Sequence, residues 1–277
     1  MRTFLIIATL LLAGAAQAGE APVGVTFTSY AADGETITGY LFRPDDPGPF
    51  PAIVALHGCG GLFKRNGQAF SSRHADWAQR FHKAGYVVLF PDSFGSRGHE
   101  SLCKVKKRPV KHADRVGDAR AAADWLTGQD FIDAGKLVLL GWSNGGSTVM
   151  RAVAPDAAPL KTDFKAAIAF YPSCRWALNK AAWQPRIKPV IHIGAADDWT
   201  PPGPCKELAA KWGLRLALYK GAYHGFDAPN SKVRVLTGRA YSSSGDGKVH
   251  VGTNHAARKA AIADVMNELK AEFASKP

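Results

Sequence analysis

The most constraining feature of this sequence is a glycine-rich turn around Ser143, which joins two runs of different character. Residues 136–140 are short, apolar and typical of a buried strand, whereas residues 146–153 can form a helix. Gly141 and Gly145 flank Ser143 in a Gly-x-Ser-x-Gly pattern. Because glycine has no Cβ, the turn can close sharply and the helix can pack close to the strand. Such a turn holds the serine hydroxyl clear of the backbone.

A serine in such a turn is a nucleophile only when a histidine accepts its proton and a carboxylate orients that histidine. In chains with this pattern, the acid and then the histidine follow the serine in sequence. An apolar strand ends just before Asp197 and Asp198, and His224 is the first histidine after the following strand. We therefore expect Ser143, one of these aspartates and His224 to meet at the carboxyl ends of parallel strands.

A second glycine-rich segment, residues 57–61, follows an apolar strand at residues 52–56. In this arrangement of strands, a loop after an early strand supplies one backbone N–H that binds a developing oxyanion. The residue after the nucleophile supplies the other. We expect the N–H groups of Cys59 and Asn144 to fill these roles, and the alternative is a glycine-rich strand end without function.

Apolar strands alternate with segments of helical periodicity along the rest of the chain. This alternation predicts an α/β fold, with a mainly parallel central sheet that helices cover on both faces. An antiparallel strand pair is expected to open the fold, with a turn near Gly34. The expected elements are strands at residues 25–30, 36–42, 86–90, 165–171, 189–194 and 214–219, and helices at residues 72–83, 114–126 and 254–273.

Five segments, in this order, resemble the dienelactone hydrolase family of α/β-hydrolases, specifically a secreted branch: residues 56–61, 91–94, 141–146, 197–201 and 223–227. Together they span the chain from the first core strand almost to the last helix. The resemblance implies the α/β-hydrolase fold and Asp197 as the triad acid, with Asp198 as the fallback. The best-known cytoplasmic members have a cysteine in place of Ser143, so their preferred dienelactone substrate is not carried over to this chain.

These observations together predict a serine hydrolase that cleaves carboxylic esters or lactones through an acyl-enzyme intermediate and needs no cofactor. Two alternatives stay open. A peptidase or acyltransferase could use the same triad. A catalytically silent binding protein could also be built on a hydrolase fold.

The basic composition bears on the partner of such an enzyme. The formal net charge is +12, and residues 104–112 concentrate part of it. Because no aromatic interleaving or nucleic-acid motif accompanies this run, we expect no nucleic-acid partner. A positive field can speed the association of anions, so the expected small-molecule substrates include anionic esters and lactones.

Arg97 lies in a loop after a buried strand and is a candidate for binding a substrate carboxylate, with Arg175 as a weaker second. Members of the resembling family have an arginine in a similar loop, although its offset does not match here. Trp142, Tyr171 and Trp199 are candidates for lining an acyl or aryl pocket. The alternatives are surface or structural arginines and aromatic residues of the core.

Four cysteines occur, and an even count in an exported chain favours disulfides, of which three pairings are possible. Cys174 and Cys205 each follow elements at one sheet edge, so we expect a Cys174–Cys205 bridge. Cys59 and Cys103 would then form the other. Four buried thiols are the alternative. No metal site is expected, because no Cys-x-x-Cys occurs and the histidines lack ligand spacing.

The N-terminus is typical of a targeting segment. Arg2 precedes an apolar run at residues 4–13, and small residues follow near Ala18. We therefore expect residues 1–18 to be a signal peptide and residues 19–277 to form one domain in the periplasm or outside the cell. The charged fraction of 21% and hydrophobic fraction of 46% are typical of one globular domain.

Overall fold

In the computed structural model, residues 21–64, 67, 69–157 and 163–274 are described. The expected signal peptide at residues 1–18 lies outside this part of the chain. Within it, no helix has both the length and the apolar character that crossing a membrane requires.

An eight-stranded sheet forms the centre of the molecule, in the order β1-β2-β4-β3-β5-β6-β7-β8. From β4 to β8 across this order, neighbouring strands are parallel, whereas β1 and β2 form an antiparallel edge. The strands are β1 (Val23–Thr28), β2 (Thr36–Phe42), β3 (Phe50–Leu56), β4 (Val87–Pro91), β5 (Ile132–Trp142), β6 (Ala166–Phe170), β7 (Val190–Gly194) and β8 (Leu216–Tyr219).

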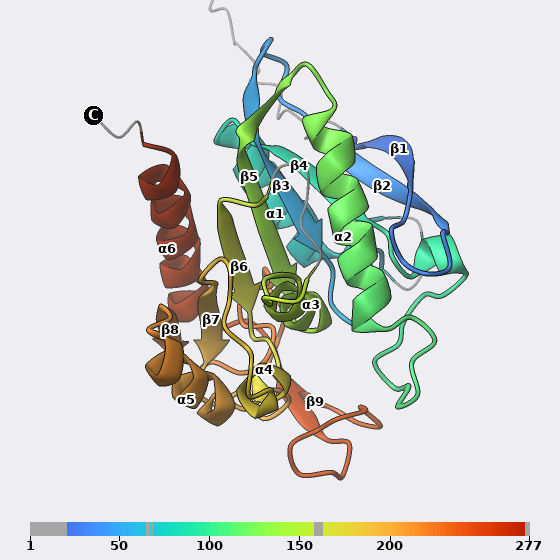
Figure 1. The fold of residues 1–277 in the computed structure, drawn as a ribbon. Helices are drawn as coiled ribbons and strands as arrows, with labels where there is room; N and C mark the ends of the chain where they lie inside the picture. The colour runs from blue at the N-terminus through green and yellow to red at the C-terminus, as the bar shows by residue number, and fades with distance from the viewer. Residues whose placement is uncertain (1–20, 65–66, 68, 158–162, 275–277) are drawn as a thin grey trace, which may run out of the picture.

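Helices cover both faces of the sheet, as Figure 1 shows with α2 in front and α1 behind. An ion pair between Arg258 of α6 and Asp76 of α1, at 2.6 Å, places these two helices on the same face. The helices are α1 (Ser72–Lys83), η1 (Gly95–Arg97), α2 (His112–Thr127), α3 (Asn144–Ala152), α4 (Arg175–Asn179), α5 (Gly203–Trp212) and α6 (His255–Phe273). The expected mainly parallel sheet with helices on both faces is confirmed.

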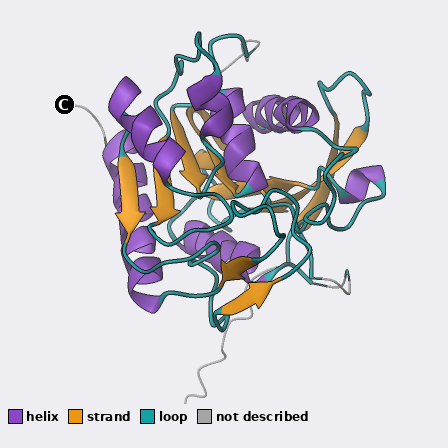
Figure 2. Cartoon of the chain, turned by 90° about the horizontal axis from the view of Figure 1, so that it is seen from below, coloured by secondary structure: helices purple, strands orange, loops and turns teal. Residues whose placement is uncertain are grey.

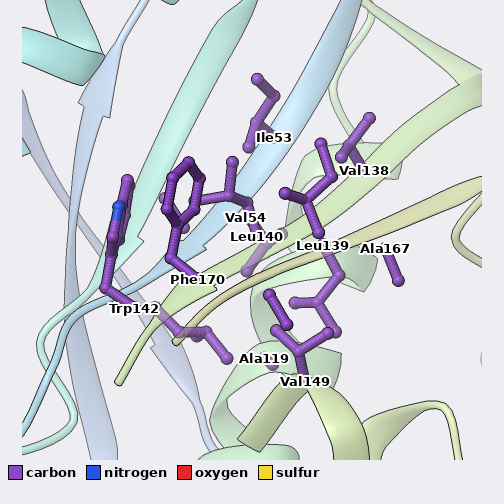
Figure 3. Close-up of a cluster of buried hydrophobic side chains, with 14 of the residues drawn as sticks. Ile53, Val54, Ala119, Val138, Leu139, Leu140, Trp142, Val149, Ala167 and Phe170 are labelled. Carbon is purple, nitrogen blue, oxygen red and sulfur yellow. The ribbon is translucent and has the colours of Figure 1, made fainter. Parts of the chain in front are cut away.

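The central strands are apolar along nearly their whole length because helices bury them from both sides. Every residue of β4 is buried, and so is every residue of β3 except one. Figure 3 shows Val54, Leu140 and Phe170 from three neighbouring strands packed together. This continuous core fixes the register of β3 against β5, and thereby the place where both strands end.

Two short strands, β9 (Arg234–Leu236) and β10 (Val249–Val251), form a separate hairpin that the sequence did not reveal. Strands of three residues are too short to show an alternating pattern, and α4, with five residues, is too short to show helical periodicity. Figure 2 views the molecule from below relative to Figure 1 and shows that many loops, drawn in teal, gather at the end of the sheet that faces the viewer.

Two disulfides join the loops, and they have the pairing expected from the sequence: Cys59–Cys103 and Cys174–Cys205. The first ties the loop after β3 to the segment between η1 and α2. The second ties the start of α4 to α5. Both lie among the loops that follow the carboxyl ends of the strands.

Removal of either bridge should destabilise the protein, because the bridges close loops with sequence separations of 44 and 31 residues. The loop-entropy model predicts a loss of about 3–4 kcal/mol of unfolding free energy for each. We expect C174S/C205S to show this loss in urea denaturation, with C59S/C103S as the comparison. Thiol titration of denatured, unreduced wild type should find no free thiol. Unchanged urea midpoints would contradict the stabilising role of the bridges, and four titratable thiols would contradict their presence.

Candidate active site

Ser143 occupies a strained turn between β5 and α3, with a positive φ of 54°. The turn exists because its glycines leave room for close backbone contacts. A Cβ on Gly145 would lie 2.1 Å from the carbonyl oxygen of Leu56, and one on Gly141 would lie 2.5 Å from the carbonyl oxygen of Gly145. The Ser143 N–H donates to the carbonyl of Phe170 at 2.9 Å. The ends of β3, β5 and β6 therefore meet at this turn.

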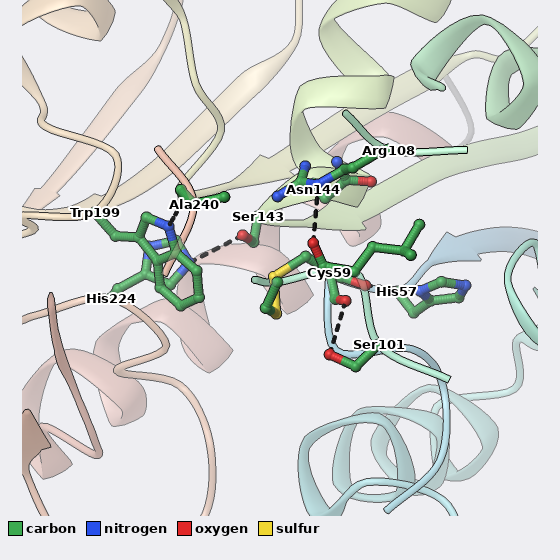
Figure 4. The surroundings of a disulfide bond; sticks show 12 residues. His57, Cys59, Ser101, Arg108, Ser143, Asn144, Trp199, His224 and Ala240 are labelled. Carbon is green, nitrogen blue, oxygen red and sulfur yellow. Dashed lines mark hydrogen bonds between the residues drawn. A yellow bond between two sulfur atoms is a disulfide. The ribbon is translucent and has the colours of Figure 1, made fainter. Parts of the chain in front are cut away.

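The three residues expected to form a triad are joined by hydrogen bonds. The distance from Ser143 Oγ to His224 Nε2 is 3.0 Å, and that from His224 Nδ1 to Asp197 Oδ2 is 2.8 Å. If Nδ1 carries the imidazole proton and donates a hydrogen bond to the carboxylate, Nε2 is free to accept the serine proton. Figure 4 shows His224 directed at Ser143.

Asp197 and His224 are each fixed by further contacts. The backbone N–H groups of Trp199 and Thr200 donate to Asp197 Oδ1 at 2.9 and 2.8 Å. The rings of Tyr171 and Trp199 lie against His224, with centroid distances of 4.5 and 4.8 Å. The imidazole therefore has one preferred orientation.

The neighbouring Asp198 has a different partner. Its carboxylate accepts hydrogen bonds from the backbone N–H of His250 at 2.8 Å and pairs with His250 Nδ1 at 2.7 Å. This contact attaches β10 to the loop after β7. Of the two aspartates that the sequence left open, Asp197 is the one that reaches His224.

Cys59 and Asn144, the expected oxyanion donors, lie on the wall of the same cavity as Ser143. The Cys59 peptide is fixed by two hydrogen bonds, since its carbonyl accepts one from the Leu102 N–H at 2.8 Å and one from Ser101 Oγ at 3.4 Å. Its side chain forms the bridge to Cys103, seen in yellow in Figure 4. The structure thus brings together the segments that carry both expected N–H donors.

The cavity beside Ser143 has a volume of about 800 Å³ and is strongly basic. Among the described residues, no aspartate or glutamate lines it. Six cationic side chains face it: Lys106, Lys107, Arg108, Lys111, Arg151 and Arg175. The basic run identified in the sequence thus forms one wall of this cavity, and Arg175, the weaker of the two candidate arginines, is also on its wall.

Two of these arginines are partly buried without an acidic partner in the described part of the chain. Arg108 donates to the Leu102 carbonyl at 3.1 Å and lies 5.1 Å from the ring centroid of Tyr241. Arg151 donates to the Ser147 carbonyl and lies over a tryptophan ring. Burial lowers the pKa of both guanidinium groups, that of Arg151 to about 10, so both are charged at neutral pH. Two uncompensated cations therefore face the cavity.

Three other expected substrate contacts are not where the sequence reasoning placed them. The Arg97 side chain is only 8% exposed and pairs with Asp33 at 2.8 Å and Asp118 at 3.0 Å. Trp142 and Tyr171 are fully buried, and neither lines the cavity. Arg97 thus belongs to an ion-pair network and the two aromatic residues to the core, whereas Trp199 does line the cavity.

The sequence reasoning missed His112 and Arg151, which line the cavity, and the segment at residues 241–243 that closes one side of it. His112 lies in the basic run that was identified, but no local pattern shows that this run returns to the nucleophile. Among the described residues, no group of three or more His, Cys, Asp or Glu side chains is arranged to hold a metal ion.

A family model described as the dienelactone hydrolase family matches residues 37–273 of this chain. A Bradyrhizobium protein described as a 2-oxo-3-(5-oxofuran-2-ylidene)propanoate lactonase is 23% identical over 223 residues, which cover 74% of this chain and 84% of that protein. The quorum-quenching protein AidA of Acinetobacter baumannii is 31% identical over 143 residues, covering 50% of this chain. This match spans 41% of the length of AidA.

Solved structures share the fold. A Klebsiella pneumoniae protein described as a dienelactone hydrolase superposes with a TM-score of 0.63 at 19% identity, covering 93% of this chain and all of the other. Esterase 2 of Thermogutta terrifontis superposes with a TM-score of 0.57 at 21% identity, covering 90% of this chain and 92% of the other. The chain therefore has the α/β-hydrolase fold expected from its sequence.

The geometry predicts how the two aspartates should differ. Asp197→Asn should slow the labelling of Ser143 by a fluorophosphonate about 10⁴-fold, because an amide at this position favours the wrong histidine tautomer. Asp198→Asn is the matched control and should change the labelling rate little, since its partner is His250. The measurement is the rate of covalent adduct formation by mass spectrometry. A larger loss for Asp198→Asn would move the acid by one residue.

Proposed function

The chain belongs to the dienelactone hydrolase family, and from this premise we propose that it is a serine hydrolase of carboxylic esters or lactones. The observation that carries the proposal is the hydrogen-bonded chain that runs from Ser143, on the wall of the cavity, through His224 to the buried Asp197. Relatives described as a lactonase and an esterase support this substrate class.

In the proposed reaction, His224 Nε2 accepts the proton of Ser143 as Oγ attacks the acyl carbon. Asp197 holds the imidazole in position and stabilises the imidazolium that forms. The backbone N–H groups of Cys59 and Asn144 bind the oxyanion of the tetrahedral intermediate. His224 then protonates the departing alcohol, which in a lactone stays attached to the acyl group. Water, activated by His224, releases the acyl group from Ser143.

The alternatives raised by the sequence are a peptidase or acyltransferase on the same residues and a silent binding protein. The hydrogen bond between Ser143 and His224, at 3.0 Å, supports a reactive serine rather than a silent site. Paired p-nitrophenyl ester and peptidyl anilide substrates separate ester from amide cleavage.

Action in the periplasm or outside the cell is part of this proposal, and the two disulfides support an oxidising compartment.

We expect Ser143→Ala to lower the turnover of p-nitrophenyl esters by about four to six orders of magnitude, because residues of a triad act as a unit. Circular dichroism should show an unchanged fold. Ser173→Ala is the matched control, because Ser173 lines the same cavity but is outside the hydrogen-bonded chain. Retention of more than about a tenth of the wild-type activity by Ser143→Ala would refute the proposal.

The basic cavity supports anionic substrates in particular. Within the described residues, Arg108 and Arg151 supply positive charge without a neutralising carboxylate, and each guanidinium lies near an aromatic ring, with Cζ-to-centroid distances of 5.1 and 4.3 Å. A substrate carboxylate can accept paired hydrogen bonds from a guanidinium, which are stronger than contacts between neutral groups. These two arginines take the role that the sequence reasoning had given to Arg97.

Esters that carry a free carboxylate should therefore have a higher kcat/KM than their neutral methyl analogues. Arg108→Gln and Arg151→Gln should each reduce this preference by about 1.5–3 kcal/mol, the range for a hydrogen bond to a charged group. Arg97→Gln is the matched control and should leave the preference intact, because Arg97 is paired with Asp33 and Asp118. Equal losses on charged and neutral esters would assign the two arginines a structural role only.

A further inference from the structure

Arg115, in the second turn of α2, connects the two segments expected to carry the oxyanion donors. Its side chain is fully buried. One terminal nitrogen donates to the carbonyl of His57 at 2.7 Å, and the other forms a short hydrogen bond to Asn144 Oδ1. His57 lies two residues before Cys59, and Asn144 follows Ser143. A single guanidinium thus bridges the loop after β3 and the start of α3.

Asn144 is held at three of its atoms. Arg115 contacts Oδ1, and Nδ2 lies 3.4 Å from His112 Nε2. Thr148 Oγ1 donates to the Asn144 carbonyl at 2.9 Å, while His112 Nδ1 lies 2.9 Å from the same hydroxyl. Burial, together with the nearby Arg151, holds the pKa of His112 well below its usual value, so the ring is neutral at pH 7. Its Nδ1–H then donates to Thr148 and its Nε2 accepts from Asn144, which satisfies every partner.

The positive charge of Arg115 is not part of an ion pair within the described residues. Its two hydrogen-bond acceptors are neutral oxygens, and it lies 5.0 Å from the ring centroid of Phe94. The neighbouring Asp118 is already engaged by Arg97 and by Ser29 Oγ. Burial lowers the pKa of Arg115 to about 9, which leaves the group cationic at pH 7.

Asp118 and Asp92 favour the charged form of Arg115, but neither forms an ion pair with it among the described residues. Burial of a cation that is only partly compensated in this way is costly. Groups of this kind gather at functional sites more often than in ordinary cores. The two acceptors of Arg115 indicate which function it could serve, because both belong to peptide segments on the wall of the cavity beside Ser143. The structure therefore gives this costly charge a specific place, in hydrogen-bond contact with the two segments that carry the expected N–H donors.

We propose that Arg115 is the positioning residue of the oxyanion hole, which holds the N–H groups of Cys59 and Asn144 at a fixed separation and places a positive charge behind them. This inference rests on the proposed function of the same site. Arg115 touches neither the substrate nor the reacting atoms. It acts through His57 and Asn144, and His112 supports it by holding the amide of Asn144.

The effect is specific to the transition state. Negative charge on the substrate oxygen develops only as Ser143 attacks, so donors set in advance stabilise the tetrahedral species more than the bound ester. Loss of Arg115 should therefore lower kcat and leave KM nearly unchanged. A residue that only maintained the shape of the cavity would change KM as well.

The test compares an ester with its thionoester analogue, in which sulfur replaces the carbonyl oxygen and accepts hydrogen bonds poorly. For Arg115→Met, which keeps the length but loses the donors and the charge, kcat on the ester should fall about 10²–10³-fold. Turnover of the thionoester should fall much less, because it uses the oxyanion hole little. The ester-to-thionoester ratio of kcat/KM should thus decrease markedly.

Arg97→Met is the matched control, since it removes another largely buried arginine that contacts α2 through Asp118 but reaches neither donor segment. It should lower stability without changing the ester-to-thionoester ratio. If Arg115→Met does not fold, Arg115→Lys gives the same comparison, because an ammonium keeps the charge but cannot bridge both acceptors. His112→Ala should reduce the ratio by a smaller factor.

Equal loss on the ester and the thionoester in these Arg115 and His112 variants would overturn the inference. That result differs from failure of the proposed function. If wild type does not turn over the ester, or if Ser143→Ala retains turnover, the proposed function fails. If wild type is active, Ser143→Ala is inactive and the ratio persists in the Arg115 variants, only the positioning role fails.

Discussion

The close contact of Gly145 with the carbonyl of Leu56 is the constraint on which the site depends. It brings the start of α3 against the end of β3, so the nucleophile and the loop of Cys59 become neighbours although they lie far apart in the chain. A side chain at residue 145 would separate them. The positive φ of Ser143 is tolerated because the neighbouring strands β3 and β6 fix the turn from both sides. His224 and Asp197 then need only approach the turn that holds Ser143.

Chain order made the central residues predictable. In a parallel sheet, the loops that follow neighbouring strands emerge at one edge, so the loops after β5, β7 and β8 bring Ser143, Asp197 and His224 together. The choice between Asp197 and Asp198 could not come from order alone. It depends on the direction of each side chain, and Asp198 turns toward His250 in a hairpin whose strands are too short to be recognised in the sequence.

The sequence could not show which side chains form hydrogen bonds or ion pairs with each other. Trp142 and Tyr171 looked like pocket aromatics, yet both donate to the buried carboxylate of Asp227, at 3.0 and 2.7 Å. Trp77 and Arg73 donate to the same carboxylate, so four donors from distant segments converge on one acid. The Arg97 assignment failed for a related reason, since its partners Asp33 and Asp118 come from other parts of the chain. The tertiary fold decides which charged side chains pair, whereas the composition gives only the net charge of the chain.

The basic residues around the site differ in how deeply their side chains are buried, and the roles proposed for them differ accordingly. Arg108 and Arg151 line the cavity, so the anionic substrate proposed above would contact them in the ground state as well as in the transition state. Such contacts improve binding more than turnover. Arg115 contacts the segments of Cys59 and Asn144 from within the protein, and in the proposed role it would interact only with the charge that forms on the substrate during the attack. Its low-dielectric surroundings strengthen that interaction, while solvent weakens those at the cavity mouth. On these two proposals, burial divides the basic residues of this site between substrate binding and stabilisation of the transition state.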